Sequence, residues 1–467
     1  MNRRALLLPA LGLGILALVG LGLATRPAGS FGSLPLLAAY HYIACAIAAG
    51  LCYAAAILLV RTGAGGRTAP GWHLGAVLLV AVLARLMVLA APPLISTDLY
   101  RYVWDGKVQA AGINPYAYIP NDPALIPLRD AGSGATAIYP NINRVDSAPT
   151  IYPPAAQGLF ALIGLTVPSI WTVKAAMLAF DLLTMGLLLR LLRVAGRPAV
   201  SVLIWAWNPL VIWEFAGAGH IDAAALAASA LAMLMVVRGH RVRGGIALGF
   251  AVLFKLLPAA LFPALWRRWD WRVPAGAAVV ILVGYGAYAS AGWRVFGYLP
   301  GYAAEEGLDG GGFLLLRLVA LVTPVPSWAG AVYAGLGLVL LAGLAALVAL
   351  PARLPTSAAS RADVIAGGSL VLSGGLLAVL SPHYPWYLTM LVLPSVLVPT
   401  WSALWLTIAA PLLYLDHGHD QVLWPALVFL PALPLLAIDL FAPQAKRRGL
   451  AQSPRLPVAR LPVDGDP

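Results

Sequence analysis

The chain has 467 residues, of which 61% are hydrophobic and 10% are charged, and its formal net charge is +12. A soluble domain carries roughly 25% charged residues, so this composition excludes an ordinary soluble protein and predicts a polytopic membrane protein. The positive charge does not predict a nucleic-acid partner, because Lys and Arg collect in the short cytoplasmic loops of membrane proteins. Both cysteines lie in one apolar run without metal-ligand spacing, and they predict neither a disulfide framework nor a metal site.

Apolar runs of about 20 residues predict the transmembrane helices. The first is expected near residues 5–24 as an uncleaved span with a cytoplasmic N-terminus, the second near 34–60 and the third near 72–95. The third span carries Arg85 in its middle. Span parity and loop charge then place the segment that follows on the extracytoplasmic side of the membrane.

Residues 96–154 form the longest polar segment, whose prolines and asparagines predict an ordered extracytoplasmic loop. It begins with STDLYRYVWDGKVQAAGINPY, where a helix would put Asp98 and Asp105 two turns apart on one side. One interpretation is structural: an interfacial helix with an Asp98–Arg101 ion pair and with its tyrosines and Trp104 at the level of the lipid headgroups. The other interpretation is a catalytic loop, and this stretch by itself favours neither.

The segment after this loop also carries charges inside apolar sequence. A short apolar piece at 155–167 is expected in the membrane interface, and a span near 170–192 follows. Within that span, Asp181 is expected to form a buried structural pair with Arg85, and Lys174 is expected to snorkel to the interface.

Polar residues recur where two later segments are interrupted. A span near 199–217 ends in Glu214-Phe-Ala-Gly-Ala-Gly-His220-Ile-Asp222, where the glycines break the helix. The segment 244–266 is either one span or a broken, re-entrant hairpin. We favour the hairpin, because irregular backbone at membrane depth is tolerated where it lines a cavity. Further spans are expected near 222–237, 273–290, 327–350, 363–380, 388–400, 401–414 and 422–441, with a disordered cytoplasmic tail at 442–467.

Ionisable residues from separate segments are therefore expected at one face of the membrane. Such a group costs roughly 2.5–3.5 kcal/mol at the centre of a transmembrane helix, so a cluster of them indicates a site. A carboxylate there can take the proton from an acceptor hydroxyl, and cations such as Arg101, Arg144 or Lys255 can hold a departing lipid phosphate. Aromatic side chains can stack on a sugar ring.

The motifs in this loop resemble the first large loop of bacterial GT-C glycosyltransferases. They are Asp98-Leu-Tyr-Arg-Tyr-Val-Trp-Asp105-Gly, Ala111-Gly-Ile-Asn-Pro-Tyr116 and Ile151-Tyr-Pro-Pro154 with Gln157, and they are similar in particular to polyprenyl-phosphate-mannose-dependent mannosyltransferases. Further motifs agree with that family: Trp207-Asn-Pro-Leu with Glu214, Gly219-His-Ile-Asp222, Phe254-Lys255 with Pro258, and His383-Tyr-Pro-Trp-Tyr387. The resemblance covers roughly residues 72–440. It divides the chain into two extra N-terminal transmembrane helices at 1–71, a catalytic domain at 72–441 and the tail.

The resemblance implies an all-α, polytopic GT-C-like bundle with about 12–14 transmembrane or re-entrant helices in the inner (plasma) membrane, with both termini cytoplasmic. It implies transfer of a hexose, with mannose favoured, from a polyprenyl-phosphate-linked donor to a lipid or glycan acceptor at the extracytoplasmic face. Arg and Lys can neutralise such a leaving group, so we expect no cofactor, although a divalent metal is not excluded. A transporter or flippase of lipid-linked sugars is the alternative, and it predicts repeat symmetry, of which we find no convincing sign. A non-catalytic membrane scaffold is a weaker third interpretation.

The resemblance also implies roles for individual residues. Asp98 matches the position of the family's essential acid and is expected to be the general base, and Asp105 is expected to position the acceptor or to orient a cation. The residues expected to bind the substrates are Arg101, Tyr102, Arg144, Tyr152, Glu214, His220, Asp222, Lys255, His383, Trp386 and Tyr387.

Overall fold

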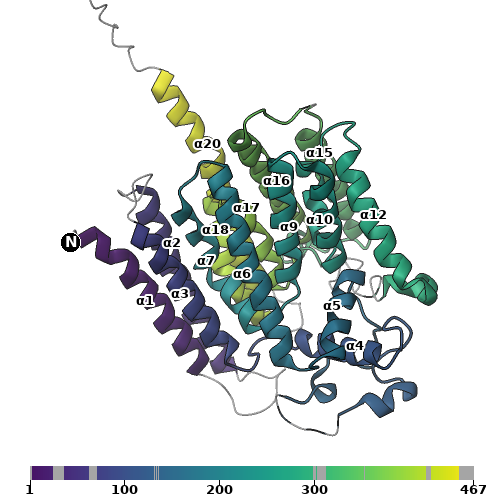
Figure 1. Ribbon diagram of the computed structural model, residues 1–467. Helices are drawn as coiled ribbons and strands as arrows, with labels where there is room; N and C mark the ends of the chain where they lie inside the picture. Colours follow the sequence, from purple (N-terminus) through teal and green to yellow (C-terminus); the bar gives the residue numbers. More distant parts are fainter. Residues whose placement is uncertain are drawn as a thin grey trace, which may run out of the picture.

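The computed structural model describes residues 3–24, 36–62, 71–297 except 131, 133 and 135, residue 301, and residues 312–351, 353–416 and 422–451. Within these residues the regular structure is entirely helical, which confirms the predicted all-α class. Figure 1 shows the helices as one bundle, with the chain's first three helices along one side and α4 and α5 at its lower end. The tail was predicted to be disordered over 442–467, but residues 442–451 continue the last helix, and 452–467 lie outside the described residues.

The helices of the bundle differ widely in length. The longer ones are α1 (Arg3–Ala24), α2 (Leu36–Thr62), α3 (Gly71–Leu89), α6 (Ile170–Val194), α9 (Asp222–Val237), α10 (Arg241–Phe254), α12 (Arg272–Ala287), α15 (Ala329–Ala349), α16 (Ala358–Leu380) and α20 (Ala432–Ala451). Shorter pieces connect them: α4 (Asp98–Ala110), η1 (Pro123–Leu128), η2 (Tyr139–Asn141), α5 (Pro154–Leu165), η3 (Ala199–Val202), α7 (Leu203–Ala206), α8 (Pro209–Val211), η4 (Ile212–Gly217), η5 (Leu257–Leu261), α11 (Phe262–Leu265), η6 (Ala289–Phe296), α14 (Leu314–Ala320), η7 (Pro385–Leu391), α17 (Val392–Ser395), α18 (Trp401–Ala409), η8 (Ala410–Leu415) and α19 (Leu423–Phe429).

Several of these helices have the length and composition of membrane spans. Among the described residues, six are long and apolar enough to cross a bilayer, or up to eight if each of two bent helix pairs counts as one span. Shorter apolar helices, including α5 and α9, lie among them. The outer surface of α12 and α15 consists of exposed leucines and valines, as expected where lipid is the solvent. The chain is a multi-pass membrane protein.

A buried ion pair ties three of the helices together, as the sequence predicted. The Nε of Arg85 on α3 lies 2.6 Å from an Asp181 carboxylate oxygen on α6, and both side chains are fully buried. Arg85 also donates to the carbonyl of Ala206, and Trp205 donates to Asp181. These bonds satisfy two charges that would otherwise be costly at this depth.

The prediction that Lys174 snorkels to the interface is wrong. Its side chain is fully buried, and its ammonium donates to the carbonyls of Val88 and Ala91 at the end of α3. The Val88 carbonyl also accepts the backbone N–H of Ala91, so Lys174 adds a charged donor to the turn in which α3 ends.

The segment from α10 to α12 is a hairpin, which confirms the preferred prediction over a single span. Lys255 ends α10 in an extended conformation, and η5 and α11 lead the chain back. A Cβ atom on Gly245 would lie 2.2 Å from the carbonyl oxygen of Val273, and one on Gly249 would lie 2.9 Å from that of Ala277. Because both contact positions advance together along the chain, α10 and α12 run parallel. The chain therefore returns to its starting end before α12 begins.

Candidate active site

The predicted catalytic loop begins with α4, which packs against α5 at very close range. A Cβ atom on Gly106 would lie 2.2 Å from the carbonyl oxygen of Phe160, and one on Gly164 would lie 2.1 Å from that of Gly106. Only glycine permits this approach of two backbones. The ring of Tyr102 stacks on Phe160 with centroids 4.6 Å apart, which fixes the rotation of α4 about its axis.

The aromatic side chains of α4 face the protein interior. Tyr100, Tyr102 and Trp104 are all buried, so the expectation that they lie at the lipid headgroups is wrong. The helix makes these contacts because α5 and α6 cover it. It is therefore part of the folded core of the loop and holds its polar residues in fixed positions.

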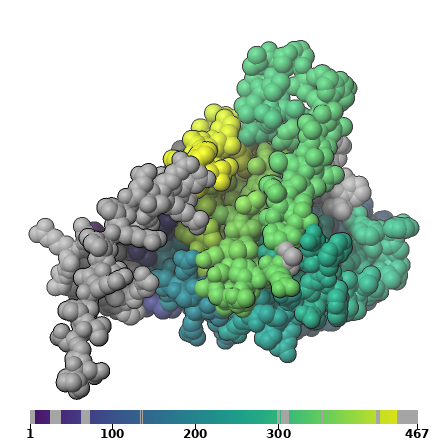
Figure 2. Space-filling view, turned by 90° about the horizontal axis from the view of Figure 1, so that it is seen from above, coloured from purple at the N-terminus to yellow at the C-terminus, as the bar shows by residue number. Residues whose placement is uncertain are grey.

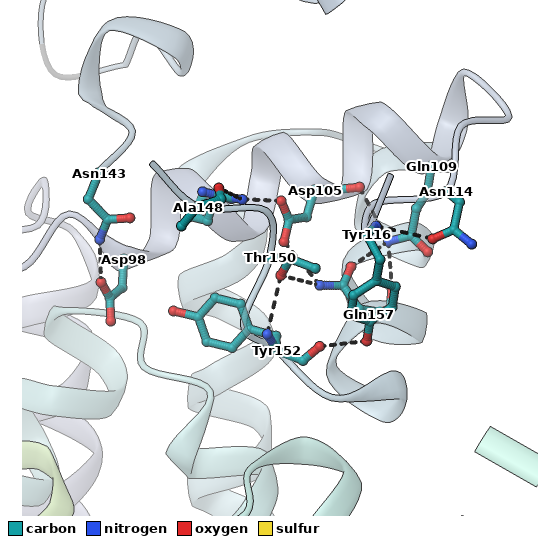
Figure 3. Close-up of polar contacts among 11 residues, drawn as sticks. Asp98, Asp105, Gln109, Asn114, Tyr116, Asn143, Ala148, Thr150, Tyr152 and Gln157 are labelled. Atoms are coloured by element: carbon teal, nitrogen blue, oxygen red, sulfur yellow. Dashed lines mark hydrogen bonds and ion pairs between the residues drawn. The ribbon is translucent and has the colours of Figure 1, made fainter. Parts of the chain in front are cut away.

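The ion pair expected between Asp98 and Arg101 is replaced by one between Arg101 and Asp105. Arg101 Nε lies 2.8 Å from Asp105 Oδ1, and Gln157 donates to the other carboxylate oxygen at 3.0 Å (Figure 3). Arg101 also donates to the carbonyl of Ala148. Both charged side chains are buried. This geometry matches the part of the prediction in which Asp105 orients a cation.

Asp98 occupies the first turn of α4 and is only partly buried. Asn143 Nδ2 donates to its Oδ1 at 2.7 Å. Figure 3 shows the Asp98 carboxylate apart from the Asp105 cluster, with Tyr152 between them. The two carboxylates of α4 therefore differ. Asp105 is buried and both of its oxygens accept hydrogen bonds, whereas Asp98 lies at the edge of the core.

The buried phenol of Tyr102 joins the start of α4 to the start of α9. Burial raises the pKa of the Tyr102 phenol well above its usual value, and the neighbouring Tyr152 and the charges of Asp98 and Asp222 raise it further. The phenol also accepts a long hydrogen bond of 3.5 Å from the backbone N–H of Ile221. The start of α4 and the start of α9 therefore meet at this ring.

A chain of polar contacts runs from Asp98 into the bundle. The backbone N–H of Asp98 donates to Ser96 Oγ at 3.2 Å, and Ser96 Oγ lies 2.9 Å from His220 Nε2. On the other side of the imidazole, His220 Nδ1 is 3.0 Å from Glu214 Oε2, although its N–H does not point along the line that a hydrogen bond needs. Tyr414 donates to the Glu214 carboxylate at 2.9 Å.

The backbone around Glu214 is irregular. The residue lies in η4, a single π-helical turn, and the chain then turns at Gly219, whose φ is +77°. The π-helical turns found inside proteins are often located at functional sites, and a positive φ favours glycine. The broken helix predicted from the glycines is therefore present, and it brings His220 beneath α4.

Lys255 and Asp222 form an ion pair beside two aromatic rings. Lys255 Nζ lies 2.7 Å from Asp222 Oδ2, and it is 4.5 Å from the ring centroid of Tyr387 and 5.9 Å from that of Trp386. Lys255 is the C-cap residue of α10 and has an extended backbone conformation, which places its side chain beyond the end of the helix. A cation held against aromatic faces is suited to bind an anionic ligand next to a ring.

The segment of His383, Trp386 and Tyr387 closes the same region. The Trp386 and His220 rings have centroids 4.2 Å apart, and His383 Nδ1 lies 2.9 Å from Asp416 Oδ2. Trp386 therefore connects the His220 chain to the Lys255 pair. All three predicted aromatic and histidine residues are buried.

Arg144 follows the asparagine that holds Asp98. Its φ of +53° is unusual for a residue with a side chain, and such values occur more often at functional sites. Burial raises the pKa of Tyr152, as does the charge of Asp98, whereas the charge of Arg144 lowers it. The charges of Arg144 and Asp98 thus both act on the Tyr152 phenol.

The structure brings most of the predicted site residues together. Residues from α4, the η4–α9 turn, the end of α10 and η7 meet in a contiguous set: Asp98, Tyr102, Tyr152, Glu214, His220, Asp222, Lys255, Trp386 and Tyr387. Arg101 and Asp105 lie in the separate buried cluster. The sequence did not predict Ser96, Asn143 or Tyr414, since single Ser, Asn and Tyr residues in polar or aromatic surroundings carry no pattern. Within the described residues, no three His, Cys, Asp or Glu side chains are grouped to hold a metal ion.

A comparison with protein families shows which family the chain belongs to. A family model described as alpha-(1->6)-mannopyranosyltransferase, N-terminal domain, matches residues 5–269. The chain belongs to this mannosyltransferase family. It is a glycosyltransferase-type membrane protein of the GT-C kind, as the motifs predicted. The family match contains Asp98, Glu214, His220, Asp222 and Lys255. It also includes nearly all of α1 and the whole of α2, the two N-terminal helices set apart from the catalytic domain in the sequence analysis. No curated protein and no solved structure matches the chain.

Proposed function

We propose that this chain transfers mannose from a polyprenyl-phosphate-linked donor to a lipid or glycan acceptor. The observation that carries the proposal is the meeting of a partly buried carboxylate, Asp98, with the Lys255–Asp222 pair and the Trp386 and Tyr387 rings. These are the groups that such a reaction needs: a base, a phosphate-binding cation and a face for a sugar.

The reaction forms one bond and breaks another at the anomeric carbon of mannose. The acceptor oxygen attacks that carbon, and the bond from the carbon to the phosphate oxygen breaks. Asp98 takes the proton of the acceptor hydroxyl, and polyprenyl phosphate leaves with the bonding electrons. General base catalysis of this kind contributes typically 10²–10⁴-fold.

Lys255 and Arg144 are the proposed ligands of the phosphate. In the described contacts Lys255 is held by Asp222, so its ammonium is already positioned and partly desolvated before a phosphate arrives. Arg144 is the next residue after Asn143, which donates a hydrogen bond to Asp98. A hydrogen bond from a charged donor to a phosphate oxygen is roughly twice as strong as one between two neutral groups. The positive charge on these two residues offsets the charge that develops on the leaving group.

The site is proposed to face the extracytoplasmic side of the inner membrane, with both termini in the cytoplasm. Support comes from charge: the long polar loop lies at one end of the bundle, and turns rich in arginine lie at the other. Short cytoplasmic loops carry the excess of Lys and Arg in membrane proteins.

The substitution Asp98→Asn tests the proposal in membranes supplied with labelled polyprenyl-phosphate mannose. We expect product formation to fall by at least roughly 100-fold. Asp146→Asn is the matched control, because Asp146 is an exposed aspartate of the same loop that accepts a bond from Asn121. Turnover of the Asp98 variant within about threefold of the unmodified enzyme excludes Asp98 as general base.

A transporter of lipid-linked sugars makes a different prediction for purified protein. Detergent solution has no compartments, so a transporter leaves the donor chemically unchanged there. Appearance of labelled mannose on the acceptor under those conditions supports the transferase, and an intact donor supports the transporter.

A further inference from the structure

The end of the bundle away from α4 carries most of the chain's net positive charge. Four turns contribute to it: those between α6 and η3, α9 and α10, α11 and α12, and α15 and α16. We call this surface the basic end, and its charged residues are Arg190, Arg193, Arg197, Arg238, Arg241, Arg243, Arg267, Arg268, Arg272, Arg353 and Arg361 with Asp270 and Asp363. Eleven arginines against two aspartates leave nine of the chain's twelve net positive charges on this surface.

Side-chain contacts join the four turns into one continuous surface. Arg197 forms an ion pair with Asp363 at 2.8 Å, and Arg361 donates to the carbonyl of Val237 at 2.8 Å. Arg241 forms an ion pair with Asp270. Figure 2 views the molecule from above, toward this end. Both aspartates are thus engaged by arginines, and most of the remaining arginines of these turns are exposed.

Tryptophans accompany the arginines in the turn between α11 and α12. Trp269 is 84% exposed and Trp271 is 68% exposed. Trp269 has a φ of +68°, a left-handed conformation that is uncommon for a residue with a side chain. The same turn leads directly into α12, whose Leu282 and Val283 are exposed as lipid-facing residues are.

Arg267 supplies an unsatisfied donor at the centre of this turn. The residue is only 3% exposed, and its Nη1 donates to backbone carbonyls that include those of Ala264 and Trp266. Its Nε is buried and has no hydrogen-bond partner among the described residues. Burial, and then the nearby positive charge of Arg241, lower the pKa of Arg267. A buried donor between like charges is stabilised by an anion.

We propose that the basic end binds the headgroup of an anionic phospholipid. Its phosphate lies against Arg241 and Arg268, above the buried positive charge of Arg267, and its acyl chains run beside Trp269 along the outer face of α12. The exposed tryptophans favour a lipid over free phosphate. Tryptophan is enriched at the level of the lipid headgroups, where its apolar ring contacts lipid, whereas a free phosphate ion offers the ring no apolar contact. This inference concerns the opposite end from Asp98 and does not rest on the proposed function.

Native mass spectrometry of the purified full-length protein tests the proposal. Phosphatidylglycerol or phosphatidylcholine is added at equal concentration, and bound lipid is counted at each step of a titration. We expect the unmodified protein to hold phosphatidylglycerol preferentially. The variant Arg268→Gln with Trp269→Ser lowers that affinity by at least about fivefold, the effect typical of one arginine near an anionic surface.

The matched control is Arg294→Gln with Trp293→Ser. These residues form an exposed tryptophan–arginine pair on η6, beyond the far end of α12, where Trp293 is 87% exposed. We expect this control to bind phosphatidylglycerol as the unmodified protein does. A melting curve of each variant in detergent shows whether it is folded. If the double variant does not fold, the single variant Arg268→Gln is tested in its place.

Three outcomes overturn the proposal. The first is equal loss of phosphatidylglycerol in the test and control variants. The second is equal binding of phosphatidylcholine, which makes the contact purely apolar. The third is displacement of the lipid by millimolar inorganic phosphate, which makes the site one for a free anion.

Discussion

Ser96 Oγ lies 2.9 Å from His220 Nε2 and also accepts the backbone N–H of Asp98, so one hydroxyl joins a buried histidine to the first turn of α4. Thr97, the residue at the N-cap position, makes no capping bond with its side chain. Ser96 therefore satisfies a helix N–H that would otherwise lack an acceptor. Glu214 stands behind the imidazole at 3.0 Å. The three side chains hold the turn that carries the proposed base.

This arrangement predicts that Ser96 and His220 act through the position of Asp98. Ser96→Ala should lower kcat about tenfold, with the KM of the donor nearly unchanged, because misplacing a catalytic group by about 1 Å can cost up to 100-fold. His220→Gln, whose amide can reach the place of Nε2, should retain more activity than His220→Asn, whose amide cannot. Steady-state kinetics of the purified variants provide the measurement.

Epistasis supplies the control for this prediction. In an Asp98→Asn background, Ser96→Ala should cause little further loss of kcat, since residues that act as a unit are not additive. A large additional rise in KM there would instead show that Ser96 or His220 contacts the substrate directly.

The Lys255–Asp222 pair predicts different effects for its two members. Lys255→Met should raise the KM of the polyprenyl-phosphate donor by roughly 10–100-fold, because a charge-assisted bond to a phosphate is worth about 1.5–3 kcal/mol. Asp222→Asn keeps the lysine and an acceptor for it, and should have the smaller effect on KM. If donor affinity measured by titration is the same in Lys255→Met as in the unmodified enzyme, Lys255 is not a phosphate ligand.

The contact between α4 and α5 predicts a sharp difference between glycines. Gly106→Ala or Gly164→Ala places a methyl group within 2.2 Å of a backbone oxygen, so the helices must separate and the melting temperature should fall by several degrees. Gly158→Ala on the same α5 has no atom within 4 Å of its new Cβ and should be neutral or slightly stabilising. Equal melting temperatures for all three variants would show that α4 does not depend on this close approach.

The buried Arg85–Asp181 pair predicts non-additive stability effects. Asp181→Leu leaves the Arg85 charge without its partner, and removing one member of a buried pair typically costs 3–5 kcal/mol. The double variant Arg85→Met with Asp181→Leu should recover much of that loss, because it removes both charges. Thermal unfolding of the single and double variants in one detergent provides the comparison, and simple additivity would mean that the two charges do not interact.

Much of the site could be predicted because its residues lie in unusual surroundings. Glu214, His220 and Asp222 stand out as polar groups at a glycine-broken helix end, and Lys255 stands out beside a proline in an apolar segment. Burying an ionisable group in a membrane costs free energy, so such residues within apolar segments can be recognised from the sequence. Asn143 and Ser96 have no such signal, since a polar loop contains many residues of their kind.

The sequence by itself determined that this protein is an all-helical, multi-pass membrane protein of a mannosyltransferase kind with a long polar loop. Apolar runs of about 20 residues have few other stable forms in a bilayer, whichever neighbours they find. Only the tertiary structure decided the partners: Arg101 with Asp105 in place of Asp98, Lys174 on carbonyls of α3, and Ser96 against His220. The contacts of Lys174 and of Ser96 join segments more than 80 residues apart, which leaves no periodic trace in the sequence. Arg101 and Asp105 are only four residues apart, and their pairing depends on which side of α4 is buried against its neighbours.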